Sequence, residues 1–308
     1  MFAPASARPT HGPAIPPQAY FLVSAVFHYL GPAFAVLLFA HLAPLGVAWL
    51  RIASAAVVFG LWRRPWRYFG KLSTSDRRTV LVLGVVLAIM NSTFYEAIAR
   101  LPLGTVAAIE YLGPIALAAA GMRTARNFAA LALAAAGVYA LTEVRIVGQP
   151  VGYLFAFANC GLFVLYVALG HRLASSGHGI DRLGAAMIVA MLAALPIGIG
   201  QAAPAFSSPA LLGAAVGVGI SSSVIPYVCD QLAMARLPRA TFSLMLALLP
   251  ATAACIGLLV LRQVPTLRDV IGVALVIGGV AFHAEPVRLD ATKRKDQEWI
   301  TSDSATRG

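Results

Sequence analysis

The chain has 308 residues, of which 59% are hydrophobic and 11% are charged. An average soluble domain is roughly 25% charged, so this composition excludes an ordinary water-soluble globular fold and also excludes disorder over most of the chain. The net charge is +11, but the basic residues stand in short gaps between apolar runs, without the aromatic interleaving of a nucleic-acid-binding surface. We therefore expect a lipid bilayer as the surroundings of the protein and no nucleic-acid partner.

Ten apolar runs follow one another along the chain. A helix needs roughly 20 residues to cross a bilayer, so a chain of this length has room for about ten crossings. The sequence thus predicts an all-α polytopic membrane protein with ten transmembrane helices. The runs are residues 18–40, 44–62, 79–99, 103–121, 127–142, 151–170, 183–200, 210–235, 240–261 and 267–284.

The basic residues predict the orientation of these helices. Eighteen of the 23 lie in the even-numbered loops and the two tails, whereas four lie in the odd-numbered loops. By the positive-inside rule, both termini and the even loops are expected in the cytoplasm. Residues 1–15 lack the features of a signal peptide and are predicted to be a disordered cytoplasmic tail, and residues 286–308 a second cytoplasmic tail.

The two halves of the chain resemble each other. The tripeptide Arg100-Leu101-Pro102 recurs as Arg236-Leu237-Pro238, an offset of 136 residues. Because five crossings is an odd number, a repeat of five helices must be inverted in the membrane, as in many secondary transporters. We predict two inverted five-helix repeats, residues 16–145 and 146–285. At the same offset, Thr105 matches Thr241 and Pro114 matches Pro250.

Four ionisable residues lie inside the predicted helices. Each costs about 2.5–3.5 kcal/mol on insertion scales and so needs a reason to be there. Glu110 follows Pro102 by eight residues, which puts it roughly 12 Å into the membrane. Its function would be to bind a substrate amine or a coupling proton; its structural alternative is a hydrogen bond to a neighbouring helix. The same alternatives hold for Glu96, Arg51 and Asp230, although Glu96 also has Arg100 at i+4 for a local ion pair.

Neutral polar residues add further candidates for a binding site. Substrate hydrogen bonds and helix-to-helix hydrogen bonds are the two interpretations of each. Prolines within the helices are candidate kinks, and the carbonyls that they free are candidate ligands, with simple packing as the alternative. The polar candidates are Asn91, Tyr95, Tyr111, Ser223 and Tyr227, and the prolines are Pro32, Pro114, Pro226 and Pro250.

Motifs for enzymatic chemistry are missing from the sequence. Gly219-Ile220-Ser221 lacks the second glycine of a nucleophile elbow, and neither an HExxH motif nor a phosphate-binding loop is found. His171 and His178 are too sparse for a metal site. We therefore expect no enzyme activity, no metal and no cofactor, and an intramembrane enzyme or a sensor is the alternative from another class.

Several stretches resemble the EamA branch of the drug/metabolite transporter superfamily, and within it the bacterial threonine/homoserine exporters. The likeness extends from about residue 20 to 284, and its most specific part spans the third and fourth helices. The stretches are Leu50-Arg51, Trp62-Arg63-Arg64-Pro65-Trp66-Arg67, Met90-Asn91, Phe94-Tyr95, Leu101-Pro102-Leu103-Gly104, Glu110-Tyr111-Leu112-Gly113-Pro114, Ile225-Pro226-Tyr227 and Leu237-Pro238-Arg239-Ala240-Thr241-Phe242.

The resemblance implies a secondary transporter that exports small metabolites by alternating access, with small amino acids as substrate and protons as a candidate coupling ion. It also implies a functional Glu110, because the exporters carry a glutamate before Gly-Pro. The chain departs from the family in the first helix, which lacks a lysine, and where the family has Glu-Pro and Gly-Glu. This chain has Leu249-Pro250 in place of Glu-Pro and Arg262-Gln263 in place of Gly-Glu. It also has Glu96 at a position where the family commonly has an apolar residue. A drug or nucleoside exporter of the same fold is the alternative, and the oligomeric state is left open.

Overall fold

The computed structural model describes residues 16–70, 72–121, 124–142, 149–174, 179–234 and 249–282. This part of the chain consists of helices and short connections, without a strand. The helices are α1 (Pro17–Leu38), α2 (Pro44–Arg63), α3 (Trp66–Phe69), α4 (Thr74–Ile98), α5 (Leu103–Gly121), α6 (Ala125–Thr142), α7 (Pro150–Ala174), α8 (Gly179–Phe206), α9 (Pro209–Gly219), the π-helical turn η1 (Ile220–Val224), α10 (Ile225–Met234), α12 (Leu249–Leu261) and α13 (Leu267–Phe282).

The all-α prediction is confirmed over these residues. Each of the ten apolar runs falls on a helix, and α9, η1 and α10 together cover the eighth run. Of the ninth run, only the part from residue 249 lies within the described residues. Five helices in the described part are long and apolar enough to cross a membrane, and four further helices are apolar but shorter. The five are Gln18–Leu38, Pro44–Arg63, Thr74–Ile98, Gly179–Phe206 and Pro209–Asp230.

The outer surface of the helices is apolar. Leu154 of α7, Leu192 of α8 and Leu259 of α12 are 67%, 58% and 79% exposed. Soluble proteins rarely expose so many large apolar side chains, whereas hydrocarbon tails solvate them as well as a protein core does. This surface is therefore suited to contact with lipid.

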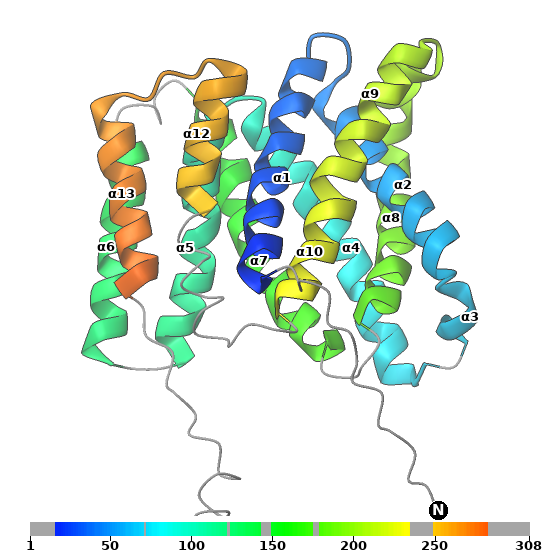
Figure 1. Cartoon of the computed structure of the whole chain (residues 1–308), viewed down its shortest axis with the longest axis horizontal. Helices are drawn as coiled ribbons and strands as arrows, with labels where there is room; N and C mark the ends of the chain where they lie inside the picture. The colour runs from blue at the N-terminus through cyan, green and yellow to red at the C-terminus, as the bar shows by residue number, and fades with distance from the viewer. Residues whose placement is uncertain are drawn as a thin grey trace, which may run out of the picture.

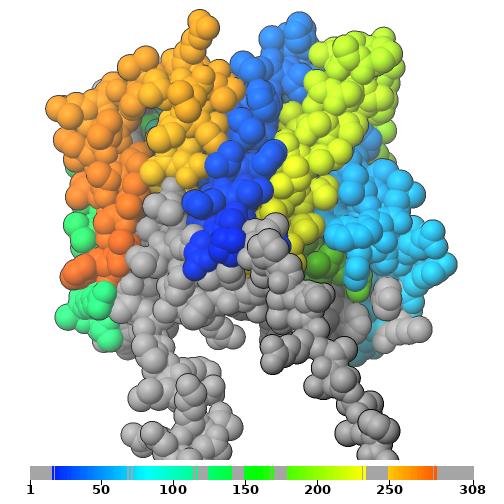
Figure 2. Space-filling model, viewed as in Figure 1, coloured from blue at the N-terminus to red at the C-terminus, as the bar shows by residue number. Residues whose placement is uncertain are grey.

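The helices run up and down between two ends of the molecule. The connections from α1 to α2, from α8 to α9 and from α12 to α13 lie at the upper end in Figure 1, whereas α3 and the last turns of α10 and α13 lie at the lower end. We call these the upper end and the α3 end. On the face seen in Figure 2, α1 crosses between α9 and α12, and it contacts both helices as well as α10.

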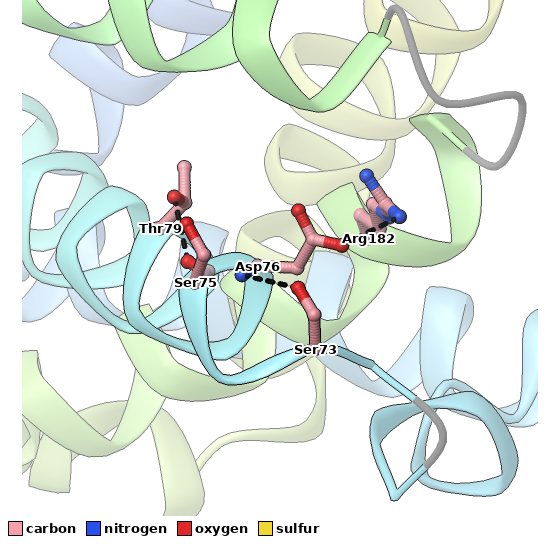
Figure 3. Close-up of polar contacts among 5 residues, drawn as sticks. All are labelled: Ser73, Ser75, Asp76, Thr79 and Arg182. Atoms are coloured by element: carbon pink, nitrogen blue, oxygen red, sulfur yellow. Dashed lines mark hydrogen bonds and ion pairs between the residues drawn. The ribbon is translucent and has the colours of Figure 1, made fainter.

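Ion pairs tie three helices together at the α3 end. The Arg63 Nε atom donates to Asp181 Oδ1 at 2.7 Å, which joins the end of α2 to the start of α8. The Arg182 Nη2 atom donates to Asp76 Oδ2 at 3.2 Å, which joins α8 to the first turn of α4 (Figure 3). Ser73 caps α4, because its Oγ accepts from the Asp76 amide at 3.1 Å.

Residues 262 and 263, where the family has Gly-Glu, end α12 at the upper end. Arg262 has a φ of 54°, in the left-handed region that glycine adopts without strain. The next side chain turns toward α5, where Gln263 Oε1 accepts from the Leu103 amide at 3.1 Å. Arg262 thus ends α12 in a conformation that favours glycine, and Gln263 serves as an acceptor for the first turn of α5.

Small residues let the helices around the interior approach closely. A Cβ atom at Gly31 of α1 would lie 2.3 Å from the Ser222 Cβ atom of η1, and one at Gly113 of α5 would lie 3.0 Å from the Cys160 carbonyl oxygen of α7. A larger residue at Gly31 would require the backbone at Ser222 to shift, and one at Gly113 would require the Val164 side chain, 2.6 Å away, to move. These two contacts hold η1 and α7 against the first-half helices that carry the polar interior.

Candidate functional site

Arg51 is buried in the middle of α2, with 5% of its surface exposed. Its Nε atom donates to Ser223 Oγ at 2.9 Å, and its Nη2 atom donates to the Ser222 carbonyl oxygen at 3.0 Å. The guanidinium carbon lies 5.5 Å from the centre of the Tyr95 ring, within cation–π range. The buried cation is thus held by neutral acceptors and an aromatic face, and it makes no ion pair with the described residues.

The local sequence explains why the Ser222 carbonyl is free to accept from Arg51. In an α-helix this carbonyl would accept from the amide of residue 226, but Pro226 has no N–H. The chain forms a π-helical turn here, and the Ile225 amide donates to the Ile220 carbonyl instead. Pro226 therefore frees a carbonyl in the interior, the role foreseen for prolines within the helices.

Glu110 lies on α5 with 4% of its surface exposed. Its Oε1 atom accepts from Asn159 Nδ2 of α7 at 3.2 Å. Its Oε2 atom and the Asn159 Oδ1 atom are buried and have no hydrogen-bond partner among the described residues. Two hydrogen-bonded side chains are therefore left with one unsatisfied acceptor oxygen each in the interior, which is rare in proteins and calls for a ligand or another partner.

The sequence analysis missed Asn159, which is fully buried. A signal was present, because Asn159 is an amide in the middle of the apolar run 151–170. An amide there needs hydrogen-bond partners as much as an intramembrane carboxylate does. Asn159 is not ionisable, and it lies outside the stretches that resemble the family, so neither of those two signals points to it.

Tyrosines surround Arg51 and Glu110. Tyr111, which the sequence analysis names as a candidate, packs edge-on against Phe163, with 6.0 Å between the ring centres. The ring centres of Tyr166 and Tyr227 are 6.4 Å apart. Tyr29 of α1 lies within electrostatic range of Glu110. The buried Tyr29 hydroxyl lies close to Tyr111, and the buried Tyr95 hydroxyl lies close to Arg51 and Ser222. Tyr29 and Tyr166 were not predicted, since isolated tyrosines in apolar runs are common packing residues.

Asp230 lies on α10, partly buried, below this aromatic cluster. It is within electrostatic range of Tyr111, Tyr166 and Tyr227. The Ser24 hydroxyl of α1 donates to the neighbouring Pro226 carbonyl at 3.3 Å. Asp230 thus borders the same interior from the second half of the chain.

Two of the predicted site residues make local contacts instead. Glu96 forms an ion pair with Arg100 one turn along α4, near the upper end, and Arg100 also covers the Phe155 ring. Asn91 is buried, and its Nδ2 atom donates to the Leu87 carbonyl of its own helix at 2.7 Å. Neither is hydrogen-bonded to Arg51 or Glu110. Of the prolines, Pro32, Pro226 and Pro250 are buried, and the side chain of Pro114 lies outside the described residues.

The interior therefore offers two complementary features. The guanidinium of Arg51 presents N–H groups to an anion, and the oxygens of Glu110 and Asn159 present acceptors to a group that donates hydrogen bonds. Both features join the two halves of the chain, since each side chain of the first half bonds to a residue of the second half. Among the described residues, no group of three or more His, Cys, Asp or Glu side chains is arranged to hold a metal ion.

Comparisons with known proteins add the family context. The model of the EamA-like transporter family matches residues 150–284. The threonine/homoserine exporter RhtA of Escherichia coli strain K12 is 29% identical over 268 residues, which cover 85% of this chain and 88% of that protein. The exporter of the same name from Salmonella typhimurium strain LT2 is 28% identical over 253 residues, which cover 80% and 84%.

The fold is also found among solved structures. One crystal structure superimposes with a TM-score of 0.55 at 21% sequence identity, over 86% of this chain and 97% of that chain. At this identity the likeness concerns the fold alone. The family match and the two exporters point to a transporter rather than an enzyme.

Proposed function

We propose that the chain belongs to the EamA-like transporter family, whose model matches residues 150–284, and that it is a secondary transporter that exports small amino acids of the threonine/homoserine class. A zwitterionic amino acid carries one carboxylate and one ammonium group. Arg51 would bind the carboxylate, and Glu110 would bind the ammonium. The observation that carries this proposal is that Arg51 and Glu110 are both buried, yet neither makes an ion pair among the described residues.

The energetics support a ligand between these two residues. A buried charge without an oppositely charged partner is costly, and a bound zwitterion would neutralise both charges at once. Arg51 uses Nε for the Ser223 hydroxyl and Nη2 for the Ser222 carbonyl, and a guanidinium has five N–H donors, so further N–H groups would bind a carboxylate. Tyr95 and Tyr227 lie within electrostatic range of the guanidinium and would border the ligand.

The transport mechanism that we propose is alternating access between two inverted five-helix repeats, residues 16–145 and 146–285. The helix contacts support this division, because a contact of a first-half helix with a second-half helix has a counterpart when the two halves are interchanged. In the first-to-second pairing α1 corresponds to α7, α4 to α9–α10 and α5 to α12, so the contact of α1 with α10 corresponds to that of α7 with α4. Likewise the contact of α5 with α7 corresponds to that of α12 with α1, and the family match to residues 150–284 covers one such half.

The proposed orientation puts the α3 end in the cytoplasm of a bacterium and the protein in its inner membrane. The excess of basic residues in the loops at this end supports it. Protons are the coupling ion that we propose, with Glu110 or Asp230 as the group that takes up the proton. Rocking of the two halves about the Arg51–Glu110 interior would expose the ligand to each side in turn.

The test is efflux of labelled threonine from proteoliposomes that contain the purified protein, with and without an imposed pH gradient. We expect efflux that is faster with the gradient and absent from protein-free vesicles. An Arg51→Leu variant that is shown to be folded serves as the inactive control. Failure of the folded wild-type protein to move threonine or homoserine under either condition would refute the amino-acid proposal.

The tyrosine cluster favours a second candidate, a drug exporter of the same fold. Aromatic faces bind flat organic cations well, and five tyrosines border this interior. The same vesicles loaded with a cationic dye discriminate between the two candidates. Dye efflux without threonine efflux would favour the drug exporter.

A further inference from the structure

The pairing of Glu110 with Asn159 leaves a specific arrangement of hydrogen-bonding groups. An ionised carboxylate only accepts hydrogen bonds, and the amide of Asn159 has two N–H donors and one acceptor oxygen. One amide N–H is used by Glu110 Oε1, at 3.2 Å. Glu110 Oε2 and Asn159 Oδ1 are the atoms left over, and both are buried without a partner among the described residues.

The carboxylate fixes the orientation of this amide. If the amide were flipped, its oxygen would face Glu110 Oε1, acceptor against acceptor, and the one hydrogen bond would be lost. The two unsatisfied oxygens belong to groups that are directly hydrogen-bonded, so they share one small region of the interior. The helices α5 and α7 also approach closely at Gly113 and Cys160, which holds the two side chains near each other.

Among the described residues, no cation donates a hydrogen bond to Glu110 or Asn159. Facing Glu110 are Tyr29 from α1, Arg51 from α2, Tyr111 from α5, Cys160 from α7 and Tyr227 from α10. Arg51 is within electrostatic range, but it donates to Ser222 and Ser223. The missing partner is therefore a compact donor that can serve two acceptors at once.

We propose that Glu110 and Asn159 together form an ammonium subsite, in which Asn159 is a binding residue that selects substrates by their N–H groups. The subsite rests on the proposed function, of which it specifies the substrate class. A primary ammonium group donates to Glu110 Oε2 and Asn159 Oδ1 with two of its three N–H groups. A quaternary ammonium has the same charge and no N–H, so it satisfies neither oxygen.

The first experiment measures binding to the purified protein in detergent, through the ligand-dependent rise in melting temperature. The ligands are threonine, its N,N,N-trimethyl derivative, butylammonium and trimethylbutylammonium. We expect each primary ammonium to bind the wild-type protein about 10–100-fold more tightly than its trimethylated counterpart, the value of one or two charge-assisted hydrogen bonds. Equal affinity for the two members of each pair overturns the subsite.

Variants at position 159 test the residue itself. Asn159→Leu removes the acceptor at nearly constant volume, and we expect it to weaken primary ammonium binding about 10-fold and to leave trimethylated ligands unaffected. Asn159→Asp keeps an acceptor oxygen and should keep the discrimination. The matched control is Asn127→Leu, the same change at a fully buried asparagine of α6, which should keep wild-type selectivity.

The outcomes separate this subsite from the transport function. Threonine efflux by the wild-type protein without discrimination between primary and trimethylated ligands refutes the subsite and leaves the exporter. Discrimination without threonine efflux refutes the amino-acid exporter and leaves the subsite. Equal loss of discrimination in the Leu and Asp variants would show that the amide only orients Glu110, and it would overturn a binding role for Asn159. If Asn159→Leu fails to fold, the ligand series on the wild-type protein and the Asn159→Asp variant still test the ammonium subsite.

Discussion

Two regions of this protein bury charged side chains and satisfy them in opposite ways. At the α3 end, Asp181 is paired with Arg63 and Arg182 with Asp76, cation to anion, across helices of the two halves. In the interior, Arg51 is held by a hydroxyl and a carbonyl, and Glu110 by an amide. At the α3 end the buried Asp181 and Arg182 are thus each paired with an opposite charge, whereas in the interior Arg51 and Glu110 form no ion pair among the described residues.

The difference separates residues that hold the helices together from residues that act on a ligand. A paired charge at the edge of the membrane costs little and ties α2, α4 and α8 together. An unpaired charge in the interior destabilises the folded protein unless something binds it, so its presence needs a functional reason. The following substitutions test this contrast.

The largest effect is expected from Arg51→Leu. The change removes two charge-assisted hydrogen bonds, each worth roughly 1.5–3 kcal/mol, together with the proposed carboxylate site. We expect threonine efflux to fall by at least about 100-fold. Arg100→Leu, which breaks the Glu96 pair at the upper end, is the matched control and should cost less than about threefold. Equal losses in the two variants would contradict the contrast between interior and periphery.

Glu110→Gln is expected to have the next largest effect. The amide keeps the size of the side chain and an acceptor for Asn159 but loses the charge, so threonine affinity should fall about 10-fold. Wild-type affinity should also weaken as the pH falls and the carboxylate takes up a proton, whereas the variant should show no such dependence. Isothermal binding titrations between pH 5 and 8 check both points, with Glu96→Gln as control. An unchanged pH profile in Glu110→Gln would make this carboxylate structural only.

Asp181→Asn should affect stability and leave the substrate affinity unchanged. The Arg63 guanidinium would then donate to a neutral amide oxygen in place of a carboxylate, which should lower the free energy of unfolding by about 1 kcal/mol. The melting temperature in detergent measures this loss. Asp76→Asn should cost less, because the Asp76 side chain is 34% exposed, against 3% for Asp181. A change in threonine affinity in either variant would extend the functional region to the α3 end.

The smallest effect is expected from Ser73→Ala, which removes the cap of α4. The hydrogen bond from the Asp76 amide is exposed, so the loss should be about 0.5 kcal/mol, at the low end for such caps. Ser75→Ala is the control, because Thr79 bonds to the backbone carbonyl of Ser75 and not to its side chain (Figure 3). A loss in Ser75→Ala as large as in Ser73→Ala would show that the cap contributes nothing measurable.

The sequence predicted the helices well, because hydropathy along the chain is a local property. The boundaries of α2, α5 and α7 lie within a few residues of the predicted runs. The local pair of Glu96 and Arg100 was also foreseen, since residues four apart on a helix are neighbours whatever the rest of the fold does. The family likeness pointed to Arg51, Tyr95 and Glu110, which the structure brings into one interior with Tyr111 and Tyr227.

The partners of these residues were beyond sequence reasoning. Ser222 and Ser223 lie more than 170 residues from Arg51, and Asn159 lies 49 residues from Glu110. Which side chains meet depends on how distant helices pack, and that packing is set by small residues such as Gly31 and Gly113 that look alike in any apolar run. Sequence reasoning also fails for Asn91. It shares a helix face with Tyr95, but its side chain donates to the Leu87 carbonyl of its own helix.

The amino-acid sequence by itself thus determined that this chain is helical, apolar and suited to a membrane, and which few polar residues lie inside its helices, because composition and periodicity are local. The tertiary structure alone decided which of those polar residues are satisfied and which are not. Glu96 finds its cation one turn away, whereas Glu110 receives a single hydrogen bond from a residue of the other half and keeps one oxygen unpartnered among the described residues. That distinction depends on the contact between α5 and α7, and it is where the proposed ammonium subsite lies.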